Sequence, residues 1–275
     1  MKKRYLFAAA VAAMLSMSSC SGFLDTKPDT LLTQDQTFGD PELVKSVLAN
    51  FYGRVTIGQR IDDWDQWTML DEVIHYDTND DQNIDRNKWR NYDYTLVHDL
   101  NQFLEAIKPS AAVDEATKTA YMGEVRYIRA WLYFCMGRTL GGVPIVGDQV
   151  FDYTPGMDIT TLQVPRSTEE ALYDYVISEC QEAARMLTKD TNRNSARANY
   201  WVAKMLEARA ALTAASLATY NTVEAHPQLR TAGGEVGIPA SRAKDYYETA
   251  LAAAKEVIEN GPHTLMRAKD NTPQA

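Results

Sequence analysis

Oxygen-bearing side chains alternate along one short stretch of this sequence. Every second position carries Asp or Asn: Asp77, Asn79, Asp81, Asn83 and Asp85. Carboxylate and amide oxygens are the ligands that Ca²⁺ prefers in proteins. A regular EF-hand loop would need glycine at its sixth position and glutamate at its twelfth, where this chain has Gln82 and Lys88. The spacing excludes an EF-hand and leaves two interpretations, a solvated acidic loop as the default and an irregular calcium site.

These residues belong to a longer segment, residues 60–94, that is rich in Asp, Asn, Trp and Tyr. No helical period runs cleanly through it. Nine acidic residues, and no Lys or Arg, lie between Asp62 and Asp85. We predict long surface loops here, with one short helix near Met69.

Catalytic motifs are missing from the sequence. There is no G-x-S-x-G, H-E-x-x-H, P-loop or G-x-G-x-x-G, and His75 and His98 have no cysteine or serine partner in a known pattern. Paired carboxylates could hydrolyse glycosides, but 37 acidic residues produce such pairs by chance. We therefore predict that the chain is not an enzyme.

The N-terminus reads as an export signal. Lys2, Lys3 and Arg4 precede an apolar run over residues 5–15, which is too short to span a bilayer. Small residues then lead to Cys20, in a pattern that resembles a bacterial lipoprotein box despite Met17. We predict a signal peptide over residues 1–19, lipid (palmitate) on Cys20, and a tether over residues 20–39. The alternative is an ordinary secretory signal with a chance cysteine.

The net charge limits the classes of partner that the chain is expected to bind. Without the signal's three basic residues, 25 Lys and Arg stand against 37 Asp and Glu, a net charge of −12. This balance argues against nucleic acid and against an anionic lipid surface as partners, so membrane contact is expected through the lipid alone. Cys135 and Cys180 fall at apolar helical positions. They could be buried thiols or a disulfide, which sequence alone does not decide.

Apolar periodicity predicts an all-α chain after the tether. Asp40-Pro41-Glu42 has the N-cap and first-turn residues of a helix that reaches about residue 55. Further helices are expected over about 95–107, 114–140, 168–188, 195–219 and 241–260. Ser167 is the expected cap of the 168–188 helix, with Glu170 reaching back to it. The last helix is expected to bury Tyr247, Leu251, Ala254 and Ile258.

The helices group in pairs, 115–140 with 168–188 and 195–219 with 241–260. The second helix of each pair has a small residue, an aromatic four later and a small residue three later: Ala171, Tyr175, Ser178 and Ala243, Tyr247, Ala250. This spacing resembles the second helix of a tetratricopeptide repeat, where small side chains allow close packing. We expect these residues in the core, although the loops are too long for a regular array.

Five segments carry further motifs: Cys20 with FLDTKP (23–28), Tyr94 to Ile107, GEVRYIRAWLYF (123–134) with LGGVPIV (140–146), PRSTEEA (165–171), and ARANYWVAKMLEAR (196–209). Together and in this order they resemble the SusD/RagB family of Bacteroidota outer-membrane lipoproteins. Arg126 and Arg129 share one side of their helix, and we expect them to pair with acidic groups or with loop carbonyls.

The resemblance implies tetratricopeptide-like helix pairs with long irregular loops. It also implies a lipoprotein on the outer membrane, exposed at the cell surface, that captures oligosaccharides for a TonB-dependent SusC-like transporter. Sugar recognition uses flat aromatic faces and polar side chains. The 60–94 segment offers both: Trp64, Trp67, Asp71, Tyr76, Asp77, Arg86, Trp89 and Tyr92. The tryptophans could equally anchor this loop on the helices.

Members of the family are usually longer, and their second half packs on the helical layer. Residues 40–275 are therefore expected to form an incomplete N-terminal SusD-like domain that lacks the usual C-terminal half. The alternative function is a helical scaffold subunit that binds the transporter or another protein without a small ligand of its own. The sequence does not name the ligand.

Overall fold

Helices make up nearly all of the regular structure in the computed structural model of this chain, which describes residues 32–55, 92–191, 196–220 and 230–264. The helices are α2 (Gln34–Phe38), α3 (Pro41–Arg54), α5 (Tyr94–Ile107), α6 (Glu115–Leu140), α7 (Glu169–Met186), α8 (Tyr200–Tyr220) and α9 (Ala243–Asn260), with short 3-10 turns η1 (Ile159–Leu162) and η3 (Ala240–Arg242). Within those ranges, the only β pairing is one antiparallel bridge between Pro144 and Arg166. The prediction of an all-α chain is confirmed.

The chain divides into two units, residues 1–37 and residues 38–275. In the first unit, the structure describes residues 32–37. There the Thr33 hydroxyl accepts a hydrogen bond from the Gln36 amide at 3.3 Å, at the start of α2. The helix packing described next concerns the second unit.

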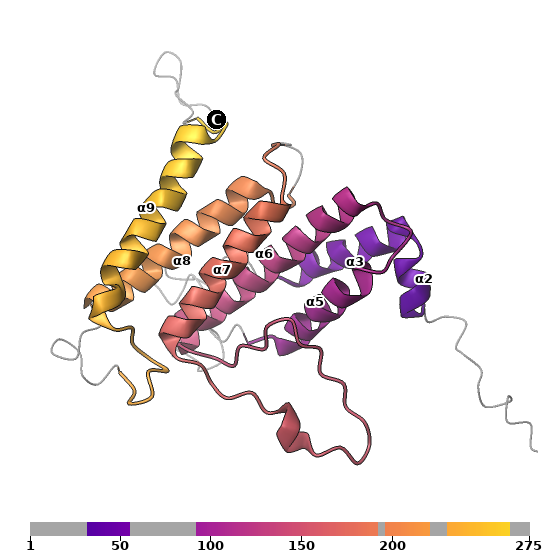
Figure 1. Cartoon of the computed structure of the whole chain (residues 1–275), viewed down its shortest axis with the longest axis horizontal. Helices are drawn as coiled ribbons and strands as arrows, with labels where there is room; N and C mark the ends of the chain where they lie inside the picture. Colours follow the sequence, from indigo (N-terminus) through magenta and orange to yellow (C-terminus); the bar gives the residue numbers. More distant parts are fainter. Residues whose placement is uncertain (1–31, 56–91, 192–195, 221–229, 265–275) are drawn as a thin grey trace, which may run out of the picture. The chain divides into compact units, whose positions relative to one another are not determined.

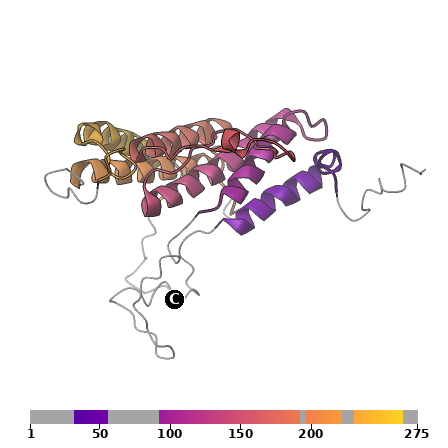
Figure 2. The same cartoon turned by 90° about the horizontal axis from the view of Figure 1, so that it is seen from below.

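Within this unit, consecutive helices pack side by side. α6 packs on α7, α7 on α8, and α8 on α9, while α3 and α5 contact α6 and each other. Figure 1 shows this succession from α3 and α5 to α9, and Figure 2 shows it from below. The two predicted pairs, α6 with α7 and α8 with α9, are both present.

Aspartate caps begin α3 and α6, as well as α5, where the Asp93 carboxylate accepts from the Leu96 amide at 2.8 Å. Asp40 and Asp114 illustrate them. The Asp40 carboxylate accepts from the Glu42 amide at 2.8 Å, and Pro41 follows as the first helical residue. The Asp114 carboxylate accepts from the Thr117 amide at 3.0 Å. Both caps satisfy backbone N–H groups that a helix leaves without a partner.

The predicted cap of α7 was wrong by one residue. Thr168, and not Ser167, accepts from the Ala171 amide, at 3.0 Å. The Ser167 amide donates instead to the carbonyl of Val143 at 3.2 Å, next to the β-bridge. This pairing keeps Ser167 extended, so the helix starts one residue later. Glu170 does not reach back; its carboxylate lies 2.7 Å from Nε of Arg242.

The apolar stripe predicted for α9 was also wrong. Tyr247, Leu251 and Ile258 are exposed, with Ile258 at 76%. The helix buries the residues one position earlier instead: Tyr246, Ala250, Ala253 and Val257. Both sets keep helical spacing, so the sequence presents two apolar faces, and packing on the alanine-rich side of α8 selects the one with smaller residues.

The small-aromatic-small motif is only partly in the core. Ala250 is buried, but Ala171 and Ser178 are exposed and Tyr175 is half-buried. The core face of α7 consists instead of residues beside the motif positions: Leu172, Tyr173, Val176, Ile177 and Cys180.

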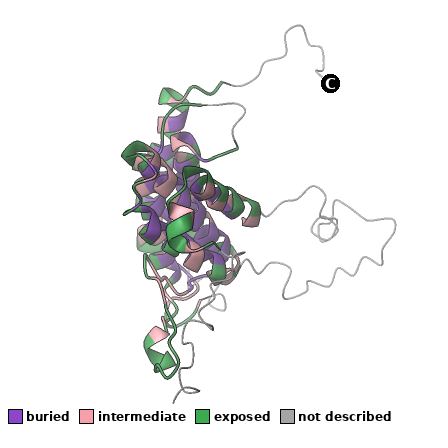
Figure 3. Ribbon diagram, turned by 90° about the vertical axis from the view of Figure 1, so that its right-hand side faces the viewer, coloured by how far each residue is buried: buried purple, intermediate pink, exposed green. Residues whose placement is uncertain are grey.

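Small residues allow the helices to approach closely. A Cβ added to Gly123 on α6 would lie 2.9 Å from Cβ of Met186 on α7. α8 buries six alanines with no exposed surface: Ala203, Ala210, Ala211, Ala214, Ala215 and Ala218. Figure 3 shows the buried residues between the helices and the exposed ones outside. The unit is held together chiefly by these apolar contacts.

Candidate functional site

Most of the predicted site lies outside the described residues. Trp64, Trp67, Asp71, Tyr76, Asp77, Arg86 and Trp89 fall there, as do Cys20 and the alternating oxygen ligands Asn79, Asp81, Asn83 and Asp85. Tyr92 is the one predicted ligand-binding residue that the structure places. Tyr92 is 58% exposed and lies two residues before the start of α5.

Two anchored helices flank the 56–91 segment. The segment follows α3 and precedes α5. An ion pair joins these two helices: Nη1 of Arg54 on α3 lies 2.5 Å from Oδ2 of Asp99 on α5. On α3, the Tyr52 hydroxyl donates to the Glu124 carboxylate on α6 at 2.7 Å. Nε of Arg197 donates to the same carboxylate at 2.8 Å. The helices on either side of the segment are therefore held in fixed positions.

Tyr92 is the outer member of a series of aromatic contacts. Its ring centroid lies 4.8 Å from that of Tyr94, Tyr94 lies 6.3 Å from Tyr133, and Tyr133 lies 5.1 Å from Tyr175. The last two contacts are edge-to-face, the arrangement that the ring quadrupoles favour. The series connects an exposed ring to the interior across α5, α6 and α7. Sequence reasoning missed it, because its members lie on three different helices.

Burial raises the pKa of Tyr94, Tyr133 and Tyr175, so all three phenols stay neutral. The Tyr94 hydroxyl donates to the carbonyl of Pro144. The Tyr133 hydroxyl accepts from the amide of Val146 at 3.2 Å. The phenols thereby hold the chain that follows α6.

A buried polar cluster holds the next residues of that chain. We call it the arginine cluster; its members are Asn101, Arg126, Arg129, Asp148 and Glu179. Arg129 has no exposed surface, yet Nε and Nη2 donate to Oε2 of Glu179 at 2.9 and 2.6 Å. Nη1 donates to Asn101 at 2.6 Å and to the carbonyl of Gly147 at 3.0 Å. The predicted pairing of this arginine with acidic groups and a loop carbonyl is confirmed.

Arg126 and Asp148 form the outer side of the arginine cluster. Arg126 donates to Glu179 at 2.7 Å and to Asp148 at 3.1 Å. Nη2 of Arg129 donates to Asp148 at 2.6 Å. Partial burial alone would raise the pKa of the Asp148 carboxyl, but the hydrogen bond and charge of Arg129, with those of Arg126, lower it.

The lowered pKa of Asp148 gives a pH prediction. Its folded pKa lies below its unfolded pKa of about 4, so its stabilisation is present above that pH and is lost as the pH falls through the folded pKa. We expect Asp148→Asn to lower the urea midpoint at pH 7, and this difference from the wild type to shrink as the pH falls below about 4. Urea unfolding at several pH values measures it. An equal difference at all pH values would contradict it.

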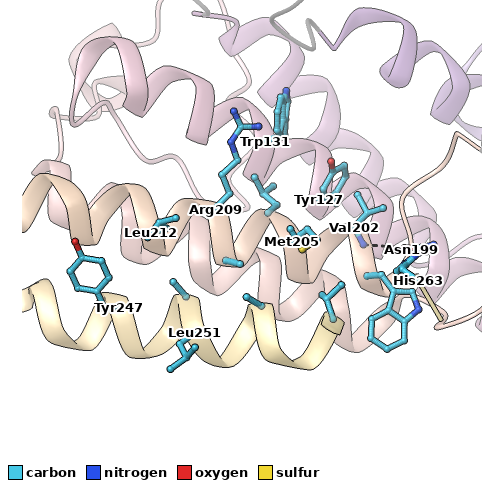
Figure 4. Close-up of a pocket in the computed structure, with 16 residues that line it drawn as sticks. Tyr127, Trp131, Asn199, Val202, Met205, Arg209, Leu212, Tyr247, Leu251 and His263 are labelled. Carbon is cyan, nitrogen blue, oxygen red and sulfur yellow. Dashed lines mark hydrogen bonds between the residues drawn. The ribbon is translucent and has the colours of Figure 1, made fainter. Parts of the chain in front are cut away.

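An open apolar groove lies between α6, α8 and α9 (Figure 4). Its volume is about 840 Å³. Its lining comes from three helices: Trp131 from α6, Met205 and Leu212 from α8, and Tyr247 and Leu251 from α9. The exposed apolar stripe of α9 is therefore part of the groove's lining.

Few polar groups face the groove. They are Asn199, Arg209 and His263, together with the Tyr127 and Tyr247 hydroxyls and the Trp201 indole, whose N–H donates to the carbonyl of Lys189 at 2.8 Å. The Arg209 guanidinium lies 5.9 Å from the Trp131 ring centroid and 5.6 Å from that of Phe134, a cation–π arrangement. Such a lining suits an apolar surface better than a hydroxyl-rich sugar, which needs many hydrogen-bonding partners.

Metal and thiol chemistry find no support in the part of the chain that the structure describes. It holds no group of three His, Cys, Asp or Glu side chains placed to bind a metal. Cys135 and Cys180 are buried free thiols there, and burial raises the pKa of the Cys135 thiol to about 11. Among the same residues, no helix is both long and apolar enough to cross a bilayer.

Comparison with known proteins identifies relatives of this chain. Residues 22–212 match a SusD-like family described as "Starch-binding associating with outer membrane". A SusD-like protein of Bacteroides ovatus is 25% identical over 222 residues, which cover 75% of this chain and 39% of that protein. A SusD-like protein of Formosa agariphila is 23% identical over 186 residues, covering 62% of this chain and 35% of its own.

Solved structures show the same fold. A SusD-like protein from Bacteroides fragilis superposes with a TM-score of 0.58 at 22% identity, over 84% of this chain and 40% of that one. A SusD-like carbohydrate-binding protein from the same species gives 0.52 at 14% identity, over 82% and 41%. The chain thus spans about 40% of the length of these relatives, and it matches their N-terminal portion. It belongs to the SusD-like family whose description associates it with the outer membrane.

Proposed function

We propose that this chain is a cell-surface lipoprotein that captures oligosaccharides and delivers them to a TonB-dependent outer-membrane transporter. The family match over residues 22–212 carries the proposal. In this proposal, acyl chains on Cys20 hold the protein at the outer membrane, since each buried methylene contributes about 0.8 kcal/mol.

The ligand site in this proposal is the aromatic and acidic segment before α5. Its members are Trp64, Trp67, Asp71, Tyr76, Asp77, Arg86, Trp89 and Tyr92. The exposed Tyr92 ring, supported from behind by Tyr94, has the open face that stacking on a sugar needs. The paired ends of α3 and α5 give this segment a rigid base. Rigid support of a binding loop reduces the ordering cost on binding.

We also propose that residues 40–275 are the N-terminal helical part of a longer SusD-like protein. The share of each relative that this chain covers supports it.

The ligand proposal predicts saturable binding of an oligosaccharide by the full protein. Trp64→Ala, Trp67→Ala and Trp89→Ala are each expected to weaken binding about fivefold, because one stacking contact contributes on the order of 1 kcal/mol. Calorimetry against a glycan panel measures this.

Tyr220→Ala is the matched control, because Tyr220 is 67% exposed at the end of α8 and belongs to no proposed site. Full binding by all three tryptophan variants would show that these residues only anchor the loop. No binding of any glycan by the wild-type protein would favour the alternative, a helical scaffold subunit. The apolar groove is the observation that favours that alternative.

A further inference from the structure

Two arginines differ from the others in the part of the chain that the structure describes. That part contains ten arginines, and eight of them donate to a carboxylate or to a backbone carbonyl. Arg138 on α6 and Arg209 on α8 have neither contact with any described residue. Acidic residues are in excess in this chain, at 37 against 28 Lys and Arg. Two guanidinium groups without a carboxylate are therefore a local exception, and both are open to an anionic ligand.

Both arginines lie against the same buried ring. Phe134 is 1% exposed, and its ring centroid lies 5.5 Å from the Arg138 guanidinium and 5.6 Å from that of Arg209. The Arg209 guanidinium also lies 5.9 Å from the Trp131 ring centroid. Stacking on a ring uses the face of a guanidinium and leaves its N–H edge free for a bidentate hydrogen bond to a carboxylate. Two cations from different helices at one ring thus create a positive potential there.

Arg209 also lies in the apolar groove between α6, α8 and α9, where its side chain extends toward Trp131 (Figure 4). On α8, Val202, Met205, Arg209 and Leu212 follow one another at spacings of three, four and three, so they form one stripe along the groove. That stripe is apolar except for a single cation. The groove's volume of about 840 Å³ falls within the range of sites for small ligands, roughly 300–1,000 Å³.

The lining of the groove selects the class of ligand. Met205, Leu251 and Ala254 supply hydrocarbon walls, against which an alkyl chain is removed from water favourably. These walls offer no hydrogen-bonding partners to the hydroxyls of a sugar. The Arg209 guanidinium calls for an anionic group at one end of such a chain, and it opposes a cationic one. An alkyl carboxylate meets both requirements.

We propose that this groove binds a small amphipathic carboxylate. Its apolar chain lies against α8 and α9, its carboxylate accepts from Arg209, and Arg138 adds positive charge on the other side of the contact with Phe134. The site is separate from the segment before α5, to which the proposed function assigns the oligosaccharide, and it does not depend on that function.

Calorimetry with octanoate, octanol and octylamine tests the site in the full chain. One octanoate per chain is expected to bind, at least tenfold more tightly than octanol or octylamine, because a hydrogen bond to a charged group is stronger than one to a neutral group. Arg209→Gln is expected to remove this preference for the acid and to leave octanol binding unchanged. Leu251→Asn, at a 57% exposed position, is expected to weaken octanoate and octanol by the same factor.

Arg185→Gln is the matched control, because Arg185 is an exposed arginine on α7 that does not line the groove. Equal affinities of the wild type for octanoate and octanol would overturn the proposal, as would the same loss of preference in Arg185→Gln and Arg209→Gln. No saturable binding of octanoate would also overturn it and would leave the groove to the scaffold alternative. Competition between octanoate and a bound glycan would show that the groove belongs to the oligosaccharide site, whereas glycan binding that persists in Arg209→Gln supports two separate sites.

Discussion

Replacing Arg129 by methionine will lower the free energy of unfolding by about 3–5 kcal/mol, because it breaks a buried charge pair from one side. The side chain has no exposed surface and makes five hydrogen bonds, to Glu179, Asp148, Asn101 and Gly147. Methionine fills a similar volume but donates none of them. Glu179, whose side chain is 6% exposed, is then left with Arg126 as its remaining cationic partner. Urea unfolding followed by circular dichroism measures the loss.

Arg185→Met is the matched control for this prediction. Arg185 pairs with Glu182 on the surface of α7, with side-chain exposures of 63% and 43%. Exposed pairs contribute about 0–1 kcal/mol, so little change is expected. Adding Glu179→Leu to Arg129→Met should recover part of the loss, because it removes the buried carboxylate. A loss below about 1 kcal/mol for Arg129→Met would contradict the view that this cluster holds α5, α6 and α7 together.

The sequence predicted the helices and their pairing well, because caps and apolar periods are local. Asp40, Asp114 and the glycines after α6 each act within a few residues of where they stand. Arg126 and Arg129 were also recognisable, since charges beside an apolar stripe need partners. Which partners they take depends on residues 50 positions away, such as Glu179, and no local pattern encodes that.

The errors share one physical origin. Ser167 and Thr168 are both good caps, and the hydrogen bond from the Ser167 amide to the Val143 carbonyl decides between them. On α9, the sets Tyr246-Ala250-Ala253-Val257 and Tyr247-Leu251-Ala254-Ile258 both keep a helical period. Packing on the small residues of α8 selects the first set. Where a sequence offers two equivalent local solutions, contacts with distant residues choose between them.

The connection over residues 150–165 was expected as a loop, but its path was not predicted, and composition shows why. Residues 150–165 contain Pro155, Gly156 and Pro165, which mark a loop without saying where it goes. Its path is set by Asn101 and Arg129, which bind the carbonyls at its base. A sequence reading sees these two residues only as members of helices.

Gly142→Ala is expected to destabilise the protein by about 3 kcal/mol through overpacking against backbone. A Cβ at this position would lie 2.0 Å from the carbonyl oxygen of Ser167 and 2.7 Å from the carbonyl carbon of Thr168. Backbone atoms cannot move aside as a side chain can, so the two ends of the α6–α7 connection must separate. The Gly142 amide also donates to the carbonyl of Glu235 at 2.6 Å, and that bond would be strained as well.

A second glycine provides the control for this substitution. Gly53, near the end of α3, has nothing within 4 Å of an added Cβ. Because alanine is favoured over glycine in helices by up to about 1 kcal/mol, Gly53→Ala should be neutral or slightly stabilising. Thermal and urea unfolding of both variants measure the contrast. Equal effects would mean that the close approach at Gly142 is not needed. A loss confined to Gly142→Ala, with faster proteolysis within residues 150–165, would show that this glycine closes the base of the α6–α7 connection.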